Sequence, residues 1–254
     1  YQSLVFITSL LENRNSTTIY EIHILASQKL ILEHKNKSQI LLKKYGEKYL
    51  NISYINMSND FSGALTGPYI STAAYYRIAL PSLLPYVDRI IYCDSDVIDF
   101  KDLTEMYKLK LDNNTYLKGM LDYFSLINEM DFMDMPKDRY VNSGVLLMNL
   151  KSMRMNNVEK KIRDFIDKHF LNHHDQTAIN GVCYNNWEVL SIKYCCFNFD
   201  NYSEIVKYNN ELNIKYRYSE EELKQAFYEP TLLHFGGYDN RRSEERRVGK
   251  ECRS

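Results

Sequence analysis

Apolar residues alternate with polar ones in several short segments and recur with a helical period in others, and the two kinds of segment alternate along the chain. The pattern predicts helices at 5–11, 28–44, 71–80, 151–170 and 175–184, and strands at 20–25, 52–55, 90–94, 118–122, 145–149 and 231–235. Helices between successive strands require crossover connections. The order therefore predicts an α/β fold, with a mostly parallel sheet flanked by helices and no internal domain boundary.

Two aspartates follow the apolar run 89–93, where the predicted strand would reach the rim of the sheet. Open α/β sheets bind their ligands at that rim. Asp94 and Asp96 are two residues apart, so both can turn toward one hard divalent cation, which prefers oxygen ligands and leaves positions for phosphate. Short acidic pairs also occur as helix N-caps or solvated turns, and the pair alone leaves both interpretations open.

Composition narrows the class of protein. The 254 residues are 44% hydrophobic and 26% charged, which suits one globular domain with a sizeable core. The net charge of −1 argues against a nucleic-acid partner. No stretch approaches the roughly 20 apolar residues of a membrane span, and no secretion signal is seen. The cysteines lack metal-ligand spacing, so we expect reduced thiols and a cytoplasmic protein with at most peripheral membrane contact.

Both ends of the sequence are unusual. Residues 242–254 are charged, lack apolar periodicity and resemble one reading frame of a sequencing adapter. We therefore expect a domain at 1–241 followed by a non-native, disordered tail, the alternative being a native basic tail. The other end begins at Tyr1 with a predicted helix, although a helix that leads into a parallel strand normally follows an earlier strand.

Four further segments follow one another in a recognisable order: 74–81 with its Tyr-x-Arg sequence, 140–149, 174–176 and 232–238. Together with the acidic pair, they resemble glycosyltransferase family 8, the retaining sugar transferases of the GT-A fold. The resemblance covers residues 1 to about 241. It implies a Rossmann-like domain that transfers glucose or galactose from a UDP-sugar, with Mn²⁺ or Mg²⁺, to a glycan or lipid-linked saccharide, as in bacterial lipopolysaccharide synthesis. Family members carry an earlier strand and an Asp-rich turn for the nucleoside, so we expect the first strand to be missing by truncation.

The resemblance implies a metal site made by Asp94, Asp96 and His234. Two oxygens and one nitrogen suit Mn²⁺ and leave positions for phosphate oxygens. The alternative for His234 is a buried histidine satisfied by hydrogen bonds. The following glycines, including Gly237, would let the backbone approach phosphate closely. The family pattern then continues with a phosphate-binding lysine, which this sequence lacks.

The resemblance also implies donor contacts from Arg77, Ser95, Asn142 and Ser143. Arg77 would face the donor phosphates or sugar hydroxyls, and its alternative is a surface salt bridge. The amide of Asn142 would bind sugar hydroxyls, and its alternative is a residue that only shapes an Asx turn.

Asp175 and Gln176 are the implied catalytic residues. Retaining hydrolases use a carboxylate nucleophile, whereas this family places a glutamine near the anomeric carbon. An amide is a poor nucleophile, so the simpler hypothesis is departure and attack on the same face, with the leaving phosphate as base. Asp175 would orient sugar hydroxyls and stabilise the developing positive charge, or else would only cap a helix.

Two other functions remain open from the sequence. A haloacid-dehalogenase-type phosphatase also ends a strand with Asp-x-Asp, but near its N-terminus and usually before a Gly-Thr pair, whereas Val97 and Ile98 follow here. The second alternative is a truncated, inactive protein that binds a nucleotide sugar without turnover.

Overall fold

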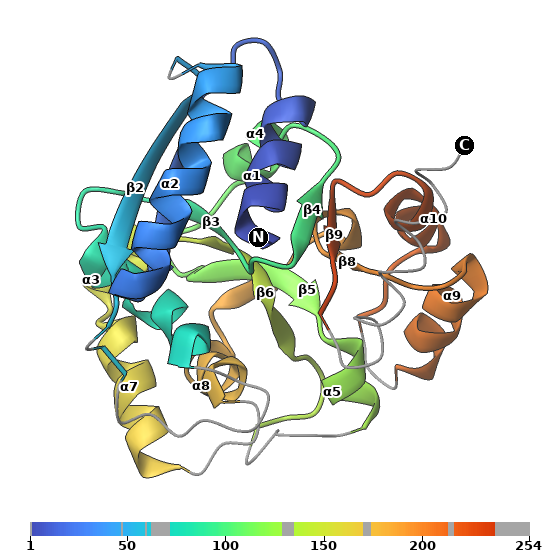
Figure 1. The fold of residues 1–254 in the computed structure, drawn as a ribbon. Helices are drawn as coiled ribbons and strands as arrows, with labels where there is room; N and C mark the ends of the chain where they lie inside the picture. Colours follow the sequence, from blue (N-terminus) through green and yellow to red (C-terminus); the bar gives the residue numbers. More distant parts are fainter. Residues whose placement is uncertain are drawn as a thin grey trace.

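Helices and strands alternate along the part of the chain that the computed structural model describes (Figure 1), which is residues 2–46, 48–58, 60–61, 72–128, 135–169, 174–212 and 216–236. Two expectations, the phosphate contact of Gly237 and the tail at 242–254, lie outside these residues. The described strands are β1 (Tyr20–Ala26), β2 (Leu50–Asn56), β3 (Ile90–Cys93), β4 (Val97–Asp99), β5 (Leu117–Leu121), β6 (Val141–Met148), β7 (Trp187–Val189), β8 (Cys196–Phe197) and β9 (Leu232–His234). None of the described helices is both long enough and apolar enough to cross a membrane.

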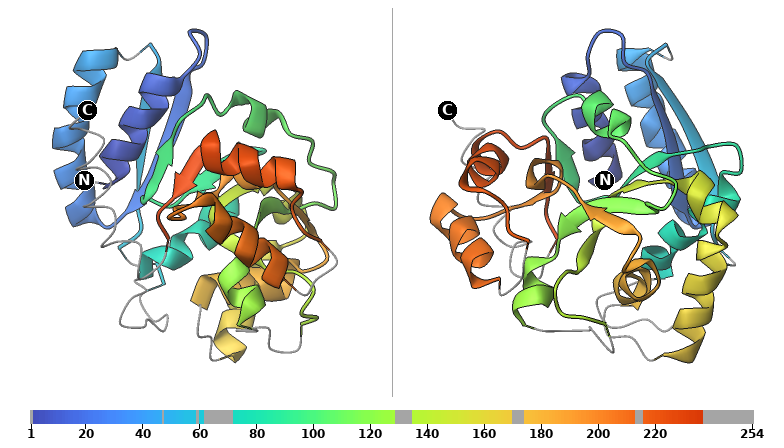
Figure 2. Two further views of the ribbon diagram at one scale, coloured as in Figure 1. Left: turned by 90° about the vertical axis from the view of Figure 1, so that its right-hand side faces the viewer. Right: turned by 180° about the vertical axis from the view of Figure 1, so that it is seen from behind.

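The described helices cover the sheets from several sides. They are α1 (Gln2–Asn13), α2 (Gln28–Tyr45), η1 (Thr72–Ala79), α3 (Leu80–Leu83), α4 (Thr104–Lys108), α5 (Tyr123–Ile127), α6 (Leu150–Met155), α7 (Val158–Lys168), α8 (His174–Cys183), η2 (Ile192–Tyr194), α9 (Tyr202–Glu211) and α10 (Glu220–Tyr228). Figures 1 and 2 show α1 and α2 at one end of the molecule, α9 and α10 at another, and α7 and α8 below the central strands. The α/β architecture is as expected.

The strands form three sheets of mixed direction, in the orders β1-β2, β3-β6-β5-β7 and β4-β9-β8. The β1–β2, β5–β7 and β8–β9 pairs are parallel, whereas β3–β6, β5–β6 and β4–β9 are antiparallel. The expected mostly parallel sheet is therefore wrong for half of these pairs. Two of the three antiparallel pairs arise because β6 runs opposite to both of its neighbours, and the third joins β4 to β9. Antiparallel neighbours need no helical crossover between them.

Strand β6 is the centre of the molecule. All eight of its residues are buried, because β3 and β5 pair with its two edges and packed elements cover its faces. The sequence indicates a strand only at 145–149, since the polar Asn142 and Ser143 interrupt the apolar run. In the structure these two polar residues extend the strand toward a cluster of acidic and amide side chains.

Two predicted helices are divided. The predicted helix 151–170 becomes α6 and α7, separated at Asn157, whose φ of 52° places it in the left-handed region that asparagine tolerates. The predicted helix 71–80 is a 3₁₀ helix, η1, followed by the short α3 with Pro81 in its first turn. Proline has no N–H and clashes with the preceding turn, so it starts a new helix more readily than it continues one.

Asp99 in β4 is a buried acid without a well-formed partner. It is 1% exposed, and neither carboxylate oxygen has a hydrogen bond of good geometry. Burial raises the pKa of Asp99 to about 8, and the nearby backbone N–H of Lys101 offsets this only in part. The folded protein therefore holds this carboxyl in its neutral form at pH 7.

We expect Asp99 to make the protein less stable as the pH rises from about 4 to about 8. In that range the carboxyl of Asp99 is ionised in the unfolded chain but protonated in the folded chain. The free energy of unfolding therefore falls by up to about 1.4 kcal/mol per pH unit. Urea unfolding of Asp99→Asn from pH 5 to 8 should show a shallower decline, with Asp164→Asn, whose side chain is 47% exposed, behaving like the wild type. Equal slopes for Asp99→Asn and the wild type would contradict the assignment.

Candidate functional site

The acidic pair lies at the end of β3, in the short turn before β4. The backbone N–H of Asp94 donates to the carbonyl of Gly144 at 2.8 Å, which continues the pairing of β3 with β6 by one residue. The chain then leaves this sheet, and β4 pairs with β9. The turn therefore joins two sheets, with Asp94 at the end of one and Asp96 at the start of the other.

Strand β9 delivers His234 to the same turn. Val97 of β4 lies opposite His234 of β9, and the N–H of Phe235 donates to the carbonyl of Asp96 at 2.9 Å. This register places the imidazole beside both carboxylates, although about 140 residues separate them in the sequence. Strand pairing, rather than local sequence, thus builds the three-residue cluster.

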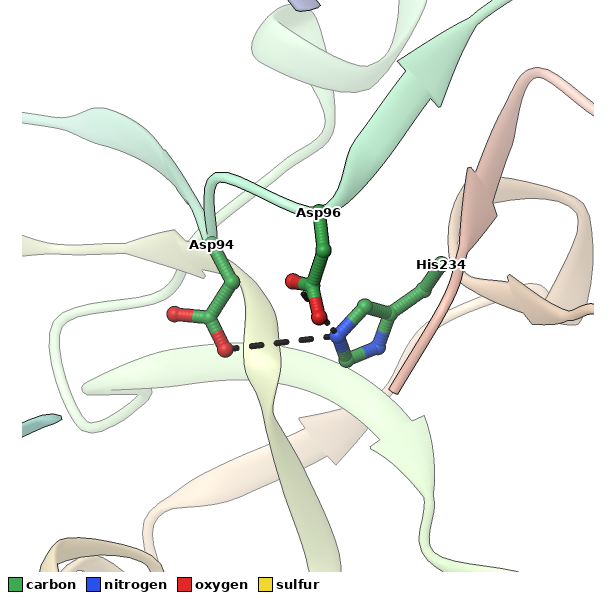
Figure 3. Close-up of side chains that lie close together, drawn as sticks. All are labelled: Asp94, Asp96 and His234. Atoms are coloured by element: carbon green, nitrogen blue, oxygen red, sulfur yellow. Dashed lines mark ion pairs between the residues drawn. The ribbon is translucent and has the colours of Figure 1, made fainter. Parts of the chain in front are cut away.

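The side chains of Asp94, Asp96 and His234 converge (Figure 3). One ligand atom from each lies within 4.8 Å of the others, and Nε2 of His234 is 3.5 Å from Oδ1 of Asp96 and 4.0 Å from Oδ2 of Asp94. Ligand atoms about 2.1 Å from a shared cation lie roughly 3–4 Å apart. Two carboxylate oxygens and one imidazole nitrogen at these separations fit a divalent cation.

Small residues make room for the imidazole, which is 4% exposed. A Cβ atom added to Gly144 would lie 2.8 Å from Nε2 of His234, and one added to Gly236 would lie 2.9 Å from it. The ring of Phe197 stacks against the imidazole at 5.5 Å, and Sγ of Cys195 lies 3.8 Å from Nδ1. Nε2 faces the two acids, an arrangement that suits a shared cation, and metal binding by His234 stays a prediction.

Arg77 is buried among carboxylates and is not part of a surface salt bridge. It is 4% exposed. Its Nη2 atom lies 2.9 Å from Oδ1 of Asp94, and its Nε atom lies 3.1 Å from Oδ2 of Asp175. Its Nη1 atom donates to the carbonyl of Ser143. Burial opposes the charge, but Asp175 and Asp94 together raise the pKa of Arg77, so the guanidinium stays positive.

Asp175 lies in the first turn of α8, which begins at His174, and its side chain points to Arg77. The helix-cap interpretation is therefore not supported. Burial raises the pKa of Asp175 to about 6, although Arg77 opposes this. The hydroxyl of Ser143 also donates to Oδ2 at 3.3 Å.

Hydrogen bonds fix the amide of Gln176 at both ends. Its Oε1 atom accepts from the backbone N–H of Ser143 at 2.9 Å, and its Nε2 atom donates to Oδ2 of Asp122 at 3.2 Å. Since both ends of the amide are used, its orientation is set before any ligand enters. This arrangement suits an electrostatic or positioning role better than nucleophilic attack.

The side chain of Asn142 is used within the protein. Its Oδ1 atom accepts from the N–H of Gly144 at 3.0 Å, as in an Asx turn, and its Nδ2 atom donates to Asp122 at 2.8 Å. The Asx-type hydrogen bond is therefore present, although Asn142 lies within β6 and also contacts Asp122. Contact between this amide and a sugar stays a prediction.

A cavity of about 1140 Å³ connects these groups. Its described lining includes nearly all the predicted site residues: Arg77, Asp94, Ser95, Asp96, Ser143, Asp175, Gln176 and His234. Asn142 is not among them. The cavity runs between β1 and β3, whose described partners are β2 and β6 alone, so each of these strands has one unpaired edge. Whether a further strand precedes Tyr1 stays a prediction.

Two residues of the site were missed from the sequence. Asp122 follows β5 as Asp94 follows β3, so its place after a strand was an available signal. Tyr92 is two residues before Asp94, on the same face of β3, and its hydroxyl donates to Oδ1 of Asp94 at 2.6 Å. The alternation of side chains along a strand could have indicated that contact.

Comparison with known proteins decides the family. A model of the family described as Glycosyl transferase family 8 matches residues 1–239. The chain belongs to this family. The match spans all the predicted site segments, so the resemblance inferred from ordered motifs is confirmed. Membership of this family favours a glycosyltransferase over a haloacid-dehalogenase-type phosphatase as the explanation of the acidic pair.

Curated relatives of this family 8 chain come from organisms as different as Bacillus subtilis and Xenopus laevis. General stress protein A of Bacillus subtilis is 32% identical over 138 residues, which is 51% of this chain and 47% of that protein. Glucoside xylosyltransferase 2 of Xenopus laevis is 27% identical over 204 residues, which is 70% of this chain and 47% of that protein. The matched part thus spans about half the length of these relatives.

Solved structures show that the family 8 chain has the GT-A fold. The galactosyltransferase LgtC, in complex with donor and acceptor sugar analogues, superposes with a TM-score of 0.72 at 20% identity, covering 96% of this chain and 90% of that chain. The glycosyltransferase GlyE of Streptococcus pneumoniae gives a TM-score of 0.62 at 21% identity, covering 94% of this chain and 52% of that chain. At these identities the likeness concerns the fold alone.

Proposed function

We propose that this chain is a retaining, metal-dependent hexosyltransferase that moves glucose or galactose from a UDP-sugar to a glycan or lipid-linked acceptor. The observation that supports it most is one cavity lined by both the Asp94–Asp96–His234 cluster and the Asp175–Gln176 pair. Such a cavity offers a cation site for a diphosphate next to fixed polar groups for a sugar. Its volume, about 1140 Å³, is ample for a nucleoside diphosphate sugar.

Asp94, Asp96 and His234 would hold Mn²⁺ or Mg²⁺. A divalent ion there supplies Lewis-acid stabilisation of the charge that develops on the leaving diphosphate. Arg77 lies against Asp94, so it adds a positive charge on the same side of the cavity. A positive charge 4 Å from a phosphate oxygen is worth about 4 kcal/mol at an effective dielectric near 20.

Transfer would proceed on one face of the sugar. The bond between the anomeric carbon and the phosphate oxygen breaks, and the acceptor hydroxyl forms its bond on the same face. The hydroxyl proton passes to the departing phosphate oxygen, so no protein nucleophile is required. Gln176, fixed by Ser143 and Asp122, presents its amide dipole to the developing charge, and Asp175 keeps Arg77 and Ser143 in place.

The choice of donor and acceptor rests on family membership. The proteins that this chain resembles include a galactosyltransferase and a xylosyltransferase, which supports transfer of a sugar residue. We assign the donor to the UDP-hexoses and place the reaction in a bacterial cytoplasmic pathway that builds surface glycans such as lipopolysaccharide.

The test is consumption of UDP-glucose and UDP-galactose by the purified chain with Mn²⁺, with Mg²⁺ and with a chelator. We expect UDP release that requires metal and a product with retained anomeric configuration by NMR. Asp175→Asn and Gln176→Ala should lower the rate by about 100-fold, the usual cost of removing one electrostatic group at the reaction centre. Gln225→Ala, exposed on α10, serves as the control.

Three results would contradict the proposal. Full activity of both Asp175→Asn and Gln176→Ala would remove the assigned centre. Metal-dependent binding of UDP without consumption of any donor would identify an inactive nucleotide-sugar-binding protein. Release of phosphate from simple phosphomonoesters would restore the phosphatase alternative.

A further inference from the structure

The two carboxylate oxygens of Asp94 have different surroundings. Oδ1 accepts a hydrogen bond from the hydroxyl of Tyr92 at 2.6 Å and lies 2.9 Å from Nη2 of Arg77. Oδ2 faces Nε2 of His234 at 4.0 Å (Figure 3). One oxygen is thus held by the protein, and the other is turned toward the remaining members of the cluster.

The environment of Tyr92 fixes its hydroxyl. Tyr92 belongs to β3, and its side chain lies on the same face of the strand as that of Asp94, two residues later. Its ring packs under the guanidinium of Arg77, with the carbon Cζ 4.5 Å from the ring centroid. Arg77 is held in turn by Asp175 and by the carbonyls of Ala74 and Ser143. The hydroxyl therefore has little freedom to leave Oδ1.

We propose that Tyr92 is a positioning residue that restricts Asp94 to one ligand oxygen and so favours small divalent cations over Ca²⁺. The inference rests on the proposed function, in which Asp94 binds the cation. Mg²⁺ requires near-octahedral geometry at about 2.0–2.1 Å, and Mn²⁺ likewise suits octahedral oxygen sites. Ca²⁺ takes six to eight ligands at about 2.3–2.6 Å and often uses both oxygens of a carboxylate.

Removal of the hydroxyl should change both affinity and selectivity. In Tyr92→Phe the aromatic ring stays under Arg77, but Oδ1 loses its shorter hydrogen bond. Asp94 then rotates more freely, which weakens Mn²⁺ binding, and Oδ1, now held by Arg77 alone, can act more readily as a second ligand atom. Partners that orient metal ligands are typically worth 10- to 100-fold in affinity. Because Arg77 still contacts Oδ1, we expect the lower end, about 10-fold.

The experiment is calorimetric titration of the chain with Mn²⁺ and with Ca²⁺. The control is Tyr218→Phe, which also loses a buried hydroxyl, one that donates to the carbonyl of Leu190 and accepts from the N–H of Leu121, both at 3.1 Å. We expect the Kd for Mn²⁺ to rise about 10-fold in Tyr92→Phe, with the Kd for Ca²⁺ unchanged or lower. Tyr218→Phe should keep both wild-type values.

Several outcomes overturn the inference. If the ratio of the Kd values for Mn²⁺ and Ca²⁺ is the same in Tyr92→Phe as in the wild type, the inference is wrong. It is also wrong if Tyr218→Phe changes this ratio as much as Tyr92→Phe does, or if the wild-type protein binds Ca²⁺ as tightly as Mn²⁺. The titration needs no sugar donor, so it is separable from the activity. Tyr92-dependent selectivity in a chain that transfers no hexose would support the inference and contradict the proposed function, and a wild type that binds neither ion would contradict both.

Discussion

Replacing Arg77 by methionine is expected to lower the free energy of unfolding by about 3–5 kcal/mol, the usual cost of removing one member of a buried ion pair. The side chain of Arg77 is only 5% exposed and lies between Asp94 and Asp175. Methionine fills much of the volume but leaves two carboxylates close to each other without their shared cation. The loss should therefore come from uncompensated charge rather than from packing.

The pH dependence of the loss follows from Asp175. Burial raises the pKa of Asp175 to about 6 even with Arg77 beside it, so removal of Arg77 raises that pKa further. A folded-state pKa above the unfolded value means that stability is present at low pH and is lost as the pH rises through the folded value. Arg77→Met should accordingly lose more stability at pH 8 than at pH 5, where Asp175 takes up a proton.

Urea unfolding at the two pH values measures this effect. The control is Arg163→Met on α7, because Arg163 pairs with Asp60 and Glu159 but its side chain is 34% exposed. Partly exposed pairs are worth about 1 kcal/mol or less. An Arg77→Met protein within 1 kcal/mol of the wild type at pH 8 would contradict the role assigned to the guanidinium.

The sequence predicts the positions of the candidate site residues better than it predicts which strands pair. The ends of the strands at Asp94 and His234 are recognisable because an apolar run stops at a polar or glycine-rich segment. Their meeting depends on β4 pairing with β9, which no local pattern specifies. Apolar periodicity likewise gives no direction to a strand, so the antiparallel setting of β6 was not predicted.

Burial of a charged residue is the other property that the sequence does not reveal. Arg77 lies in a segment whose Tyr-x-Arg sequence suits either a surface helix or a site, and only the fold encloses it with Asp94 and Asp175. The polar residues of β6 are similar, because Asn142 looks like a turn former until Asp122 is seen opposite it. Strands as short as β8, with two residues, offer no periodicity to detect.

The expected effect of Gly144→Ala is a loss of metal binding out of proportion to its effect on folding. The new Cβ atom would lie 2.8 Å from Nε2 and 2.9 Å from Nδ1 of His234, closer than such atoms approach in proteins. Gly144 belongs to the buried strand β6, so the backbone cannot easily retreat, and the imidazole must move instead. Overpacking of this kind costs about 1–3 kcal/mol in stability.

The variant Gly181→Ala separates the effect on folding from the effect on metal binding. A Cβ atom at Gly181 in α8 would press against the ring of Phe165, so it overpacks the protein away from the acidic cluster. We expect both variants to be destabilised to a similar degree, while only Gly144→Ala weakens Mn²⁺ binding, by about 10-fold or more, since a displaced ligand costs at least as much as a lost orienting partner. Calorimetry with Mn²⁺, together with thermal unfolding of the metal-free proteins, measures both quantities. If Gly144→Ala bound Mn²⁺ as tightly as the wild type, the imidazole would not be a ligand, because it cannot keep its present position beside that methyl group.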